Sequence, residues 1–414
     1  MLLTSISFAL SLILKFFSIY IAIVALFTFK KFKKYPKAAP KYKFAVIIAA
    51  RNEAPVIGET VDALYAQDYP KELFDVFVFP NNCTDNTSEV AAAHNANIIE
   101  CDFPVKNKGD VMHFAINTLM SHPNNYDLFL ILDADTYIDN HYLSAMNDAF
   151  CSGINVAMGR IEGRNPYDSW VAGCYANYFS LSNIFYSRSR SNLGVSAKLI
   201  GTGFVVRREI FEKLGGWNTT SISEDAEFAV QCALLEERIS YVPSAIAYAE
   251  NPNSFLVSLH QRKRWISGIM HTAAMYVSKV ISNFFKKPKL LFFDYIIFLL
   301  LPFSLALSYL PVILTVISYM ANGGASFTDY LLVLLITSAV SYIGTCIGIF
   351  LVSFASGRRD IRMLKGVLTF PIFSFSWRPV QFYSLFVHTK KWKEIRHGEA
   401  KLNIEQDETK VLFK

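Results

Sequence analysis

The stretch Phe44-Ala-Val-Ile-Ile-Ala-Ala50 decides the fold, because seven apolar residues in a row leave no polar face for water. Such a run is typical of a strand that is buried on both sides, as in parallel sheets covered by helices. The polar residues Arg51-Asn52-Glu53 follow at once, and residues 55–67 then carry apolar side chains at helical spacing. This part of the chain therefore predicts a strand, a polar turn and a helix.

The same alternation continues along the chain. Further strands are predicted at residues 74–79, 97–100 and 128–132, with helices at 84–94 and 109–121 between them. Strands that alternate with helices predict an α/β fold in which helices wrap a parallel sheet. No GxGxxG follows the first strand, so a dinucleotide-binding fold of the usual kind is not indicated.

Polar residues follow three of the predicted strands, at the edge where an open α/β sheet binds its ligand. They are Arg51-Asn52-Glu53, Asn81-Asn82-Cys83-Thr84-Asp85 and Asp133-Ala134-Asp135. Asn82 and Thr84 could equally be turn or cap residues. Asp133 and Asp135 are two carboxylates close together, whose repulsion a cation would relieve. Hard oxygen ligands of this kind suit Mg²⁺ or Mn²⁺ bound together with a diphosphate.

The composition indicates contact with membrane lipids. Of 414 residues, 52% are hydrophobic and 18% charged, which is more apolar than soluble domains usually are. Residues 1–30 predict a transmembrane helix, because their apolar stretch is longer than the core of a secretory signal and no cleavage site follows. The lysines between residues 30 and 37 place the following chain in the cytoplasm, at the plasma (inner) membrane.

The C-terminal third predicts more membrane contact. Residues 290–356 contain two apolar runs, with basic residues before and after the pair and none in the link at 321–329. This asymmetry predicts two transmembrane helices with an external link. Residues 360–390 are apolar but interrupted, which predicts an interfacial or broken helix, and residues 391–414 would form a cytoplasmic tail. Residues 43–285 then form one cytoplasmic domain.

Two classes of function find no support in the composition. Nucleic acid is not an expected partner, because the formal charge of +6 is small and lies mostly beside apolar runs. The six cysteines include no CxxC pair, which argues against a zinc site or a redox motif.

Four short motifs, in this order, resemble those of the membrane-embedded family 2 inverting glycosyltransferases, which include cellulose, chitin, hyaluronan and poly-N-acetylglucosamine synthases. They are Ala50-Arg51-Asn52-Glu53, the DxD of Asp133-Ala134-Asp135, Ser223-Glu224-Asp225 in place of TED, and the QxxRW of Gln261-Arg262-Lys263-Arg264-Trp265. Lys108-Gly109 resembles another family segment, whose lysine approaches the nucleotide. The resemblance implies a cytoplasmic GT-A (Rossmann-like) domain inserted between transmembrane α-helices.

The resemblance also implies roles for individual residues. Asp225 would be the catalytic base, and Asp133 and Asp135 would hold Mg²⁺ or Mn²⁺. The expected nucleotide-sugar-binding residues are Arg51, Asn52, Glu53, Asn82, Asp85, Lys108 and Asp133. The expected acceptor and diphosphate residues are Gly203, Glu224, Gln261, Arg262, Arg264 and Trp265. The family usually has an aspartate pair where Asn81-Asn82 stands, and an amide can still hydrogen-bond uracil.

The implied reaction displaces a nucleoside diphosphate from an anomeric carbon by an acceptor hydroxyl. Asp225 would take the proton of that hydroxyl, although residues 223–225 could also simply cap the next helix. Arg264 offers a forked donor to phosphate oxygens, and Trp265 offers a flat face to a sugar ring. The QxxRW segment also reads as part of an amphipathic helix on the membrane, and the two interpretations are compatible. Gly203 could be an ordinary turn or strand glycine.

The leading hypothesis is an enzyme that transfers a sugar from a UDP-sugar to a growing β-linked polysaccharide, processively and with export. The alternative enzyme adds a single sugar to a lipid acceptor, ceramide or diacylglycerol. Three spans make a thin channel for a polymer unless residues 366–389 complete it or the chain forms a homo-oligomer. A non-catalytic scaffold or sensor is the third class, and the intact Asp133, Asp135, Asp225 and QxxRW argue against it.

Overall fold

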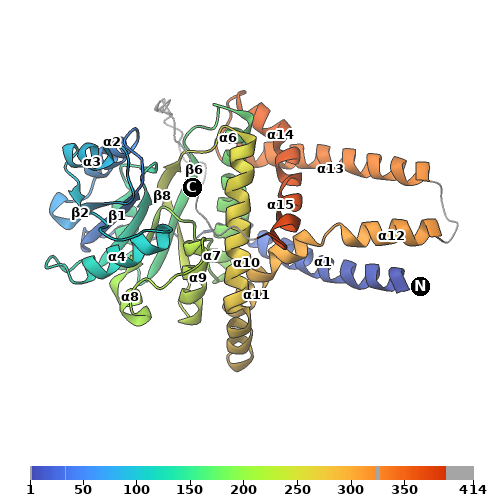
Figure 1. Cartoon of the computed structure of the whole chain (residues 1–414), viewed down its shortest axis with the longest axis horizontal. Coiled ribbons are helices and arrows are strands. Elements are labelled where there is room, and N and C mark those ends of the chain that lie inside the picture. Colours follow the sequence, from blue (N-terminus) through green and yellow to red (C-terminus); the bar gives the residue numbers. More distant parts are fainter. Residues whose placement is uncertain (1, 33, 322–326, 388–414) are drawn as a thin grey trace.

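The computed structural model describes residues 2–32, 34–321 and 327–387 (Figure 1). Eight strands form one sheet in the order β3-β2-β1-β4-β7-β6-β8-β5. The apolar run that opens the domain is β1 (Phe44–Ala50), and it is buried along nearly its whole length. It lies in parallel between β2 (Phe74–Pro80) and β4 (Leu128–Asp133). The predicted α/β fold is confirmed, and the carboxyl ends of these three strands meet at one edge.

The remainder of the sheet is mixed, which corrects the expectation of a parallel sheet. Its strands are β3 (Asn97–Ile98), β5 (Tyr137–Ile138), β6 (Val156–Gly163), β7 (Phe204–Arg207) and β8 (Ile239–Ala249). β3 extends the parallel half, whereas β7 runs antiparallel to both β4 and β6. The antiparallel direction puts the residues just before β7 beside the carboxyl end of β4. The Asp133 N–H accordingly donates to Thr202 Oγ1 at 2.9 Å.

Helices cover both faces of the sheet (Figure 1). Those of the sheet-bearing part are α2 (Ile57–Tyr65), α3 (Thr87–Ala93), α4 (Lys108–Met120), α5 (Tyr142–Cys151), α6 (Trp170–Leu181), α7 (Ser189–Leu193), α8 (Arg208–Leu214) and α9 (Glu224–Leu234). The π-helical segment Ser182–Arg188 joins α6 to α7, and single 3₁₀ turns occupy Phe27–Phe29 and Lys71–Leu73.

Three segments are long and apolar enough to cross a membrane: Leu3–Phe29, Leu290–Ala321 and Thr328–Ala355. The first contains α1 (Leu2–Leu26) and the third α13 (Phe327–Ala355), while the second is divided into α11 (Leu290–Ala306) and α12 (Leu310–Ala321). In Figure 1, α1, α12 and α13 project from the same side of the molecule, and the N-terminal end of α1 lies at their far end.

The long helix α10 (Phe255–Lys286) lies across the molecule between the sheet and the projecting helices, roughly at right angles to them (Figure 1). Within the interrupted C-terminal segment, α14 (Met363–Phe375) and α15 (Trp377–Ser384) are separated at Ser376. The tail predicted at residues 391–414 lies outside the described residues. α10, α14 and α15 therefore stand where the sheet-bearing part adjoins the membrane spans.

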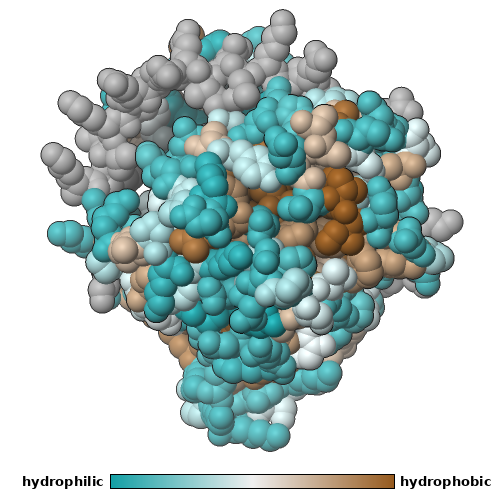
Figure 2. Space-filling view, turned by 90° about the vertical axis from the view of Figure 1, so that its left-hand side faces the viewer, coloured by the Kyte–Doolittle hydropathy of each residue, from teal (hydrophilic) through white to brown (hydrophobic). Residues whose placement is uncertain are grey.

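The surface follows this division. Figure 2 shows the face turned away from the projecting helices, which is mostly hydrophilic with a small apolar patch near its centre. The projecting helices instead expose large apolar side chains, among them Phe8, Ile19, Val312, Leu332 and Phe350. Apolar side chains that face outward on helices of this length are typical of contact with lipid tails.

A buried ion pair joins the sheet-bearing part to two of the membrane helices. Arg190 of α7 donates through Nε to both carboxylate oxygens of Asp294 in α11, at 3.1 and 3.0 Å. Tyr20 of α1 donates its hydroxyl to Asp294 Oδ1 at 2.8 Å. Both charged side chains are 4% exposed. This contact explains the acidic residue within an otherwise apolar run.

Removing one partner of this pair is expected to destabilise the protein strongly. Asp294→Ala leaves the Arg190 guanidinium buried without its carboxylate, which costs about 3–5 kcal/mol of unfolding free energy. The double variant Arg190→Met, Asp294→Leu removes both charges and should recover most of that loss. Thermal unfolding of the detergent-solubilised protein measures both effects. A single variant as stable as the wild type would show that the pair does not hold these helices together.

Candidate active site

A cleft of about 300 Å³ lies at the carboxyl ends of β1, β2 and β4 and reaches the helices beside the membrane spans. The strand ends and the loops beside them contribute Arg51, Glu53, Asn81, Lys108, Asp133 and Asp135. Helices and their approaches contribute Glu224, Asp225, Gln261, Arg264, Trp265 and Trp377. Segments that are far apart in the sequence thus meet in one cleft.

Lys108 joins an acidic residue from the strand side of the cleft to one from the helix side. It begins α4, whose N-terminus is closed by a capping box between Asn107 and Asp110. Its Nζ donates to Asp133 Oδ1 at 2.5 Å and to the Gly201 carbonyl at 2.6 Å, and it lies 4.0 Å from Glu224 Oε1. Burial lowers the pKa of Lys108, but the carboxylates of Asp133 and Glu224 outweigh it and leave the pKa raised. Lys108 is therefore a fixed cation in the cleft.

Two adjacent carboxyl groups, Glu224 and Asp225, begin α9 and line the cleft. Burial raises the pKa of Glu224 to about 7, against the opposing charge of Lys108 and with a further upward push from Asp225. Burial also raises the pKa of Asp225, while the N–H of Ala226, 2.8 Å from Oδ1, lowers it. Burial therefore makes both carboxylates stronger bases than carboxylates in water, a property that suits a general base.

A glycine brings α10 close to these carboxyl groups. A Cβ at Gly268 would lie 2.0 Å from Ser223 Oγ and 2.9 Å from the Ser223 backbone nitrogen, so only glycine allows this approach. Ser221 Oγ donates to the Gly268 carbonyl at 3.1 Å and holds the contact. The Ser223-Glu224-Asp225 segment and the QxxRW helix are joined at this point.

Three of the four residues predicted from the QxxRW segment line the cleft: Gln261, Arg264 and Trp265. Gln261 Oε1 accepts a hydrogen bond from the Tyr175 hydroxyl at 2.8 Å. The fourth, Arg262, does not line the cleft. It is fully buried on another face of α10 and donates to the Phe373 carbonyl and to Ser376 Oγ. A rotation of about 100° per residue separates neighbours on a helix, so Arg262 faces α14 and α15.

The predicted nucleotide-binding residues separate into two groups. Arg51 and Glu53 line the cleft, whereas Asn52, Asn82 and Asp85 are not among its lining residues. Asn52 Oδ1 accepts from the Thr84 N–H at 2.7 Å, and Asp85 Oδ2 accepts from the Ala54 N–H at 3.1 Å. Asn52 and Asp85 therefore hold the loops after β1 and β2 together.

At the asparagine pair, the cleft is lined by Asn81, which the sequence analysis did not select. Asn82 has a backbone φ of +47° and donates through Nδ2 to the Val105 carbonyl at 3.0 Å. Both asparagines lie beyond the end of β2, and at Asn82 the chain turns through the left-handed region, so its amide bonds the neighbouring loop while that of Asn81 stays at the cleft.

Gly203 was expected at the acceptor side, and it too lies outside the cleft lining. It belongs to the sheet: its N–H donates to the Ile131 carbonyl, and its carbonyl accepts from the Gly159 N–H. Its φ of +71° favours glycine. The neighbouring Gly201 and Thr202 line the cleft instead, so the interpretation as an ordinary strand glycine fits Gly203.

Several lining residues were not predicted from the sequence. Among them are Tyr175 and Tyr178 of α6, Phe298 of α11, Trp377 of α15, and Lys198 of the segment between α7 and β7. The only signal for the two tyrosines was an aromatic-rich block at residues 167–190. Nothing in local spacing pointed to Lys198 or Trp377.

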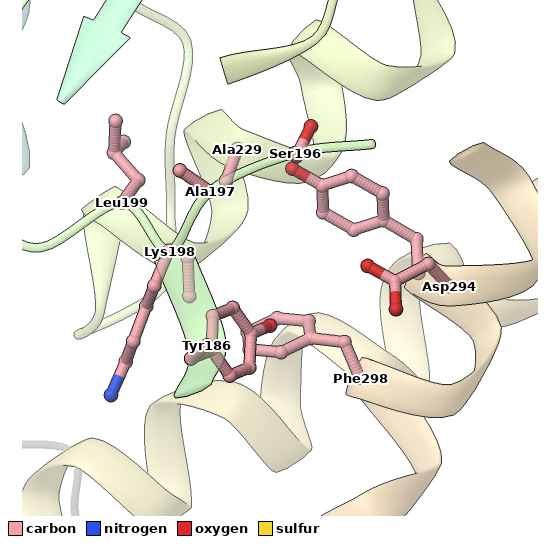
Figure 3. Close-up of a pocket in the computed structure, with 10 residues that line it drawn as sticks. Tyr186, Ser196, Ala197, Lys198, Leu199, Ala229, Asp294 and Phe298 are labelled. Atoms are coloured by element: carbon pink, nitrogen blue, oxygen red, sulfur yellow. The ribbon is translucent and has the colours of Figure 1, made fainter. Parts of the chain in front are cut away.

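A second cavity lies next to the cleft and shares four lining residues with it: Lys198, Leu199, Ala226 and Phe298. In Figure 3, the Lys198 amino group points away from Asp294, while Tyr186, Ser196 and Phe298 surround the space between them. The cavity measures only about 20 Å³, room for a single water molecule. The larger cleft is therefore the candidate site for a substrate.

The donor set of the DxD segment fits a magnesium-like ion. Within the described residues, no group of three or more His, Cys, Asp and Glu side chains converges as a metal site. Asp133 and Asp135 therefore supply at most two protein ligands, both hard oxygens on the wall of the cleft. Mg²⁺ is typically held by one or two carboxylates together with substrate phosphates. These residues suit a divalent cation that arrives with a diphosphate.

Comparisons with known sequences relate the chain to glycosyltransferases. Residues 128–355 match the family described as Glycosyl transferase family group 2. A probable glycosyltransferase, YdaM of Bacillus subtilis (strain 168), is 26% identical over 64% of this chain and 66% of its own length. The β-monoglucosyldiacylglycerol synthase of Synechocystis sp. is 23% identical over 55% of this chain and 48% of its own. The poly-β-1,6-N-acetyl-D-glucosamine synthase of Staphylococcus epidermidis is 23% identical over 54% of this chain and 53% of its own length.

The alignments cover about half to two thirds of the length of these curated relatives. Among solved structures, a mannosyltransferase from Pyrobaculum calidifontis, in complex with GDP-Man and Mn²⁺, matches with a TM-score of 0.60. The match is 19% identical and covers 91% of this chain and 99% of that one. At this identity the likeness concerns the fold, and the GT-A (Rossmann-like) fold expected for the sheet-bearing part is confirmed.

Proposed function

We propose that this chain, which belongs to glycosyl transferase family group 2, transfers a sugar from a UDP-sugar to an acceptor hydroxyl, with inversion at the anomeric carbon. One observation carries the proposal: Asp133, Asp225 and Arg264, from three distant segments, line a single cleft beside the membrane helices. That cleft offers a base, a cation and a site for a divalent metal to the same substrate.

Each group has a distinct task in the proposed reaction. Asp225 accepts the proton of the acceptor hydroxyl as its oxygen attacks the anomeric carbon. Arg264 hydrogen-bonds the oxygens of the departing diphosphate through its forked guanidinium. Lys108 holds Asp133 in place and adds positive charge on the strand side of the cleft. A divalent cation on Asp133 and Asp135, when bound, would neutralise charge on the diphosphate.

The acceptor is either a membrane lipid or a growing polysaccharide, and the arrangement of the membrane helices favours a lipid as the acceptor. A polymer exported by one chain needs an enclosed path between its helices. α1 packs on α12, where Ser7 Oγ donates to the Pro311 carbonyl, whereas every side chain at residues 331–344 of α13 is exposed. The described helices of one chain therefore offer no closed ring, and we rank single addition to a lipid such as diacylglycerol first.

The second candidate product is the β-linked polysaccharide of the leading sequence hypothesis. It is favoured by the aromatic side chains of Tyr178, Trp265 and Trp377 in the cleft, because flat apolar faces suit sugar rings. A second copy of the chain packed on α13 would then have to complete the exit path.

The proposed location is the inner face of the plasma membrane, with the cleft in the cytoplasm. α1 and α13 both end on the side of the sheet (Figure 1). In the sequence, Lys30, Lys31 and Lys34 follow α1, and Arg358 and Arg359 follow α13. Basic residues accumulate on the cytoplasmic side of membrane proteins.

The test is a donor panel. Isolated membranes that contain the protein are incubated with labelled UDP-glucose, UDP-galactose, UDP-N-acetylglucosamine and GDP-mannose, with Asp225→Asn membranes as the blank. Label in organic-extractable material from one UDP-sugar supports the lipid product. A long glycosidase-sensitive polymer supports the polysaccharide instead. Transfer from GDP-mannose alone would contradict the assignment of UDP as the donor nucleotide. The absence of transfer from every donor would overturn the proposal.

Removal of divalent cations is expected to abolish transfer. EDTA should reduce turnover to the level of the blank, because Asp133 and Asp135 cannot neutralise a diphosphate without a cation between them. Added Mn²⁺ or Mg²⁺ should restore activity, and initial rates over a concentration series of each ion measure the recovery. Full turnover in EDTA would contradict the metal role of both aspartates.

A further inference from the structure

Trp377 enters the cleft from a part of the chain that carries none of the motifs. It is the first residue of α15, and it lines the same cleft as Asp225, Gln261 and Arg264. Its side chain is only partly buried. A large aromatic ring from a membrane-adjacent helix thus contributes directly to the surface that a substrate would meet.

Three rings from three helices form one wall at this end of the cleft, named here the aromatic wall (Tyr178, Trp265 and Trp377). The Trp377 ring stacks on Tyr178 with centroids 5.6 Å apart and planes at 26°, and it tilts towards Trp265 at 6.3 Å and 31°. The Tyr178 hydroxyl is also hydrogen-bonded to Lys198 Nζ at 2.5 Å. The wall therefore combines apolar faces with a polar, positively charged edge.

Such a surface suits the acceptor better than the donor. The nucleotide side of the cleft is formed by strand ends and by Lys108 and Asp133, whereas the aromatic wall stands on α6, α10 and α15, next to the membrane spans. Aromatic rings with a polar handle bind groups that have one apolar side and one hydroxylated side. A sugar ring or the glycerol end of a lipid has this character.

Arg262 holds Trp377 in position from behind the wall. Its Nη1 donates to the Phe373 carbonyl at 3.1 Å and to Ser376 Oγ at 2.8 Å, at the junction between α14 and α15. Its guanidinium lies 4.4 Å from the centroid of the Phe373 ring and 5.3 Å from that of Trp377. Two hydrogen bonds and two ring contacts from one buried side chain fix the junction against α10. Arg262 thereby couples the QxxRW helix to α15.

We propose that Trp377 is an acceptor-binding residue and that Arg262 is the positioning residue that holds it in the aromatic wall. The inference rests on the proposed function and deepens it, because it assigns the acceptor, but not the donor, to the side of the cleft formed by α15. Loss of the Trp377 ring should weaken acceptor binding and leave the donor and the base in place.

The test compares Trp377→Ala and Trp377→Phe with the wild type and with Phe382→Ala, a control on the same helix whose ring is 45% exposed. Purified protein in phosphatidylcholine vesicles receives the active UDP-sugar of the panel, with dioleoylglycerol as the acceptor probe. If the donor panel shows a polymer product, the measured quantity is instead the amount of sugar transferred per UDP released, which takes the place of the acceptor KM. Trp377→Ala should raise the acceptor KM about tenfold, as loss of a stacking contact does. Trp377→Phe should recover most of it, and Phe382→Ala should resemble the wild type.

Three readouts separate acceptor binding from damage to the fold. The donor KM and the slow release of UDP without acceptor should stay within about twofold of wild type in all variants. Arg262→Met should reproduce the rise in acceptor KM, and the double variant should be no worse than Trp377→Ala, because both changes act on one ring. An unchanged acceptor KM in Trp377→Ala, or equal changes in donor and acceptor KM, would overturn the inference. An inactive wild type would instead refute the proposed function.

Discussion

Replacement of Asp225 by asparagine is expected to lower kcat by about 10²–10⁴-fold, the usual contribution of a general base. Asparagine keeps the shape of the side chain but cannot take the proton of the acceptor hydroxyl. Binding of the UDP-sugar should change little, because Lys108, Asp133 and Asp135 remain in place on the strand side of the cleft. Radiometric transfer assays with purified protein measure kcat, and titration with UDP measures binding.

The matched control is Glu237→Gln, which removes a carboxylate just beyond the end of the same helix and outside the cleft. Its kcat should stay near the wild-type value. If Asp225→Asn turned over normally, Asp225 would not be the base. If UDP binding were lost as well, the substitution would have disturbed the site as a whole and the comparison would count against an isolated role in proton transfer.

Arg264→Gln is expected to lower kcat by about 10²–10³-fold, the effect of removing one donor to a charge that develops in the transition state. Glutamine keeps a polar side chain but is shorter, and it loses the charge and the fork that match diphosphate oxygens. The loss should appear in kcat more than in the donor KM, because the diphosphate gains charge as the sugar leaves. Initial rates over a range of UDP-sugar concentrations separate the two constants.

Lys263→Gln provides the control for Arg264, because Lys263 is the adjacent cation on α10 and is not among the lining residues of the cleft. Its Nζ lies 4.5 Å from the centroid of the Tyr383 ring on α15. Lys263→Gln should retain kcat within about twofold. Equal losses in the two variants would mean that the overall charge of the helix, and not the position of Arg264, supports the reaction.

The helical spacing already separated some of these roles. Gln261, Arg264 and Trp265 stand at i, i+3 and i+4, which share one face of a helix, while Arg262 falls on another. The motif alone assigned all four residues to the site. Periodicity would have excluded Arg262 from the cleft, and the buried contacts of Arg262 with Phe373 and Ser376 agree with it.

Other differences lay beyond any local pattern. Asn52, Asn82 and Asp85 follow strands and are polar, as ligand-binding residues are, yet Asn52 and Asp85 join two loops to each other and Asn82 bonds a neighbouring carbonyl. Loop residues that bind a ligand and loop residues that bind another loop have the same composition. Only the positions of the two loops in space distinguish the two kinds of residue.

By itself, the sequence determined the α/β alternation, the burial of β1 and the convergence of Asp133 with the loop after β1. Those properties depend on apolar spacing and on the common edge of parallel strands, which act over short distances along the chain. Only the tertiary structure decided that Tyr178, Trp265 and Trp377 meet, and that Ser223 touches α10. These contacts depend on how closely whole helices pack. Ser223 can approach α10 only because Gly268, 45 positions later in the chain, has no Cβ in the space that Ser223 occupies.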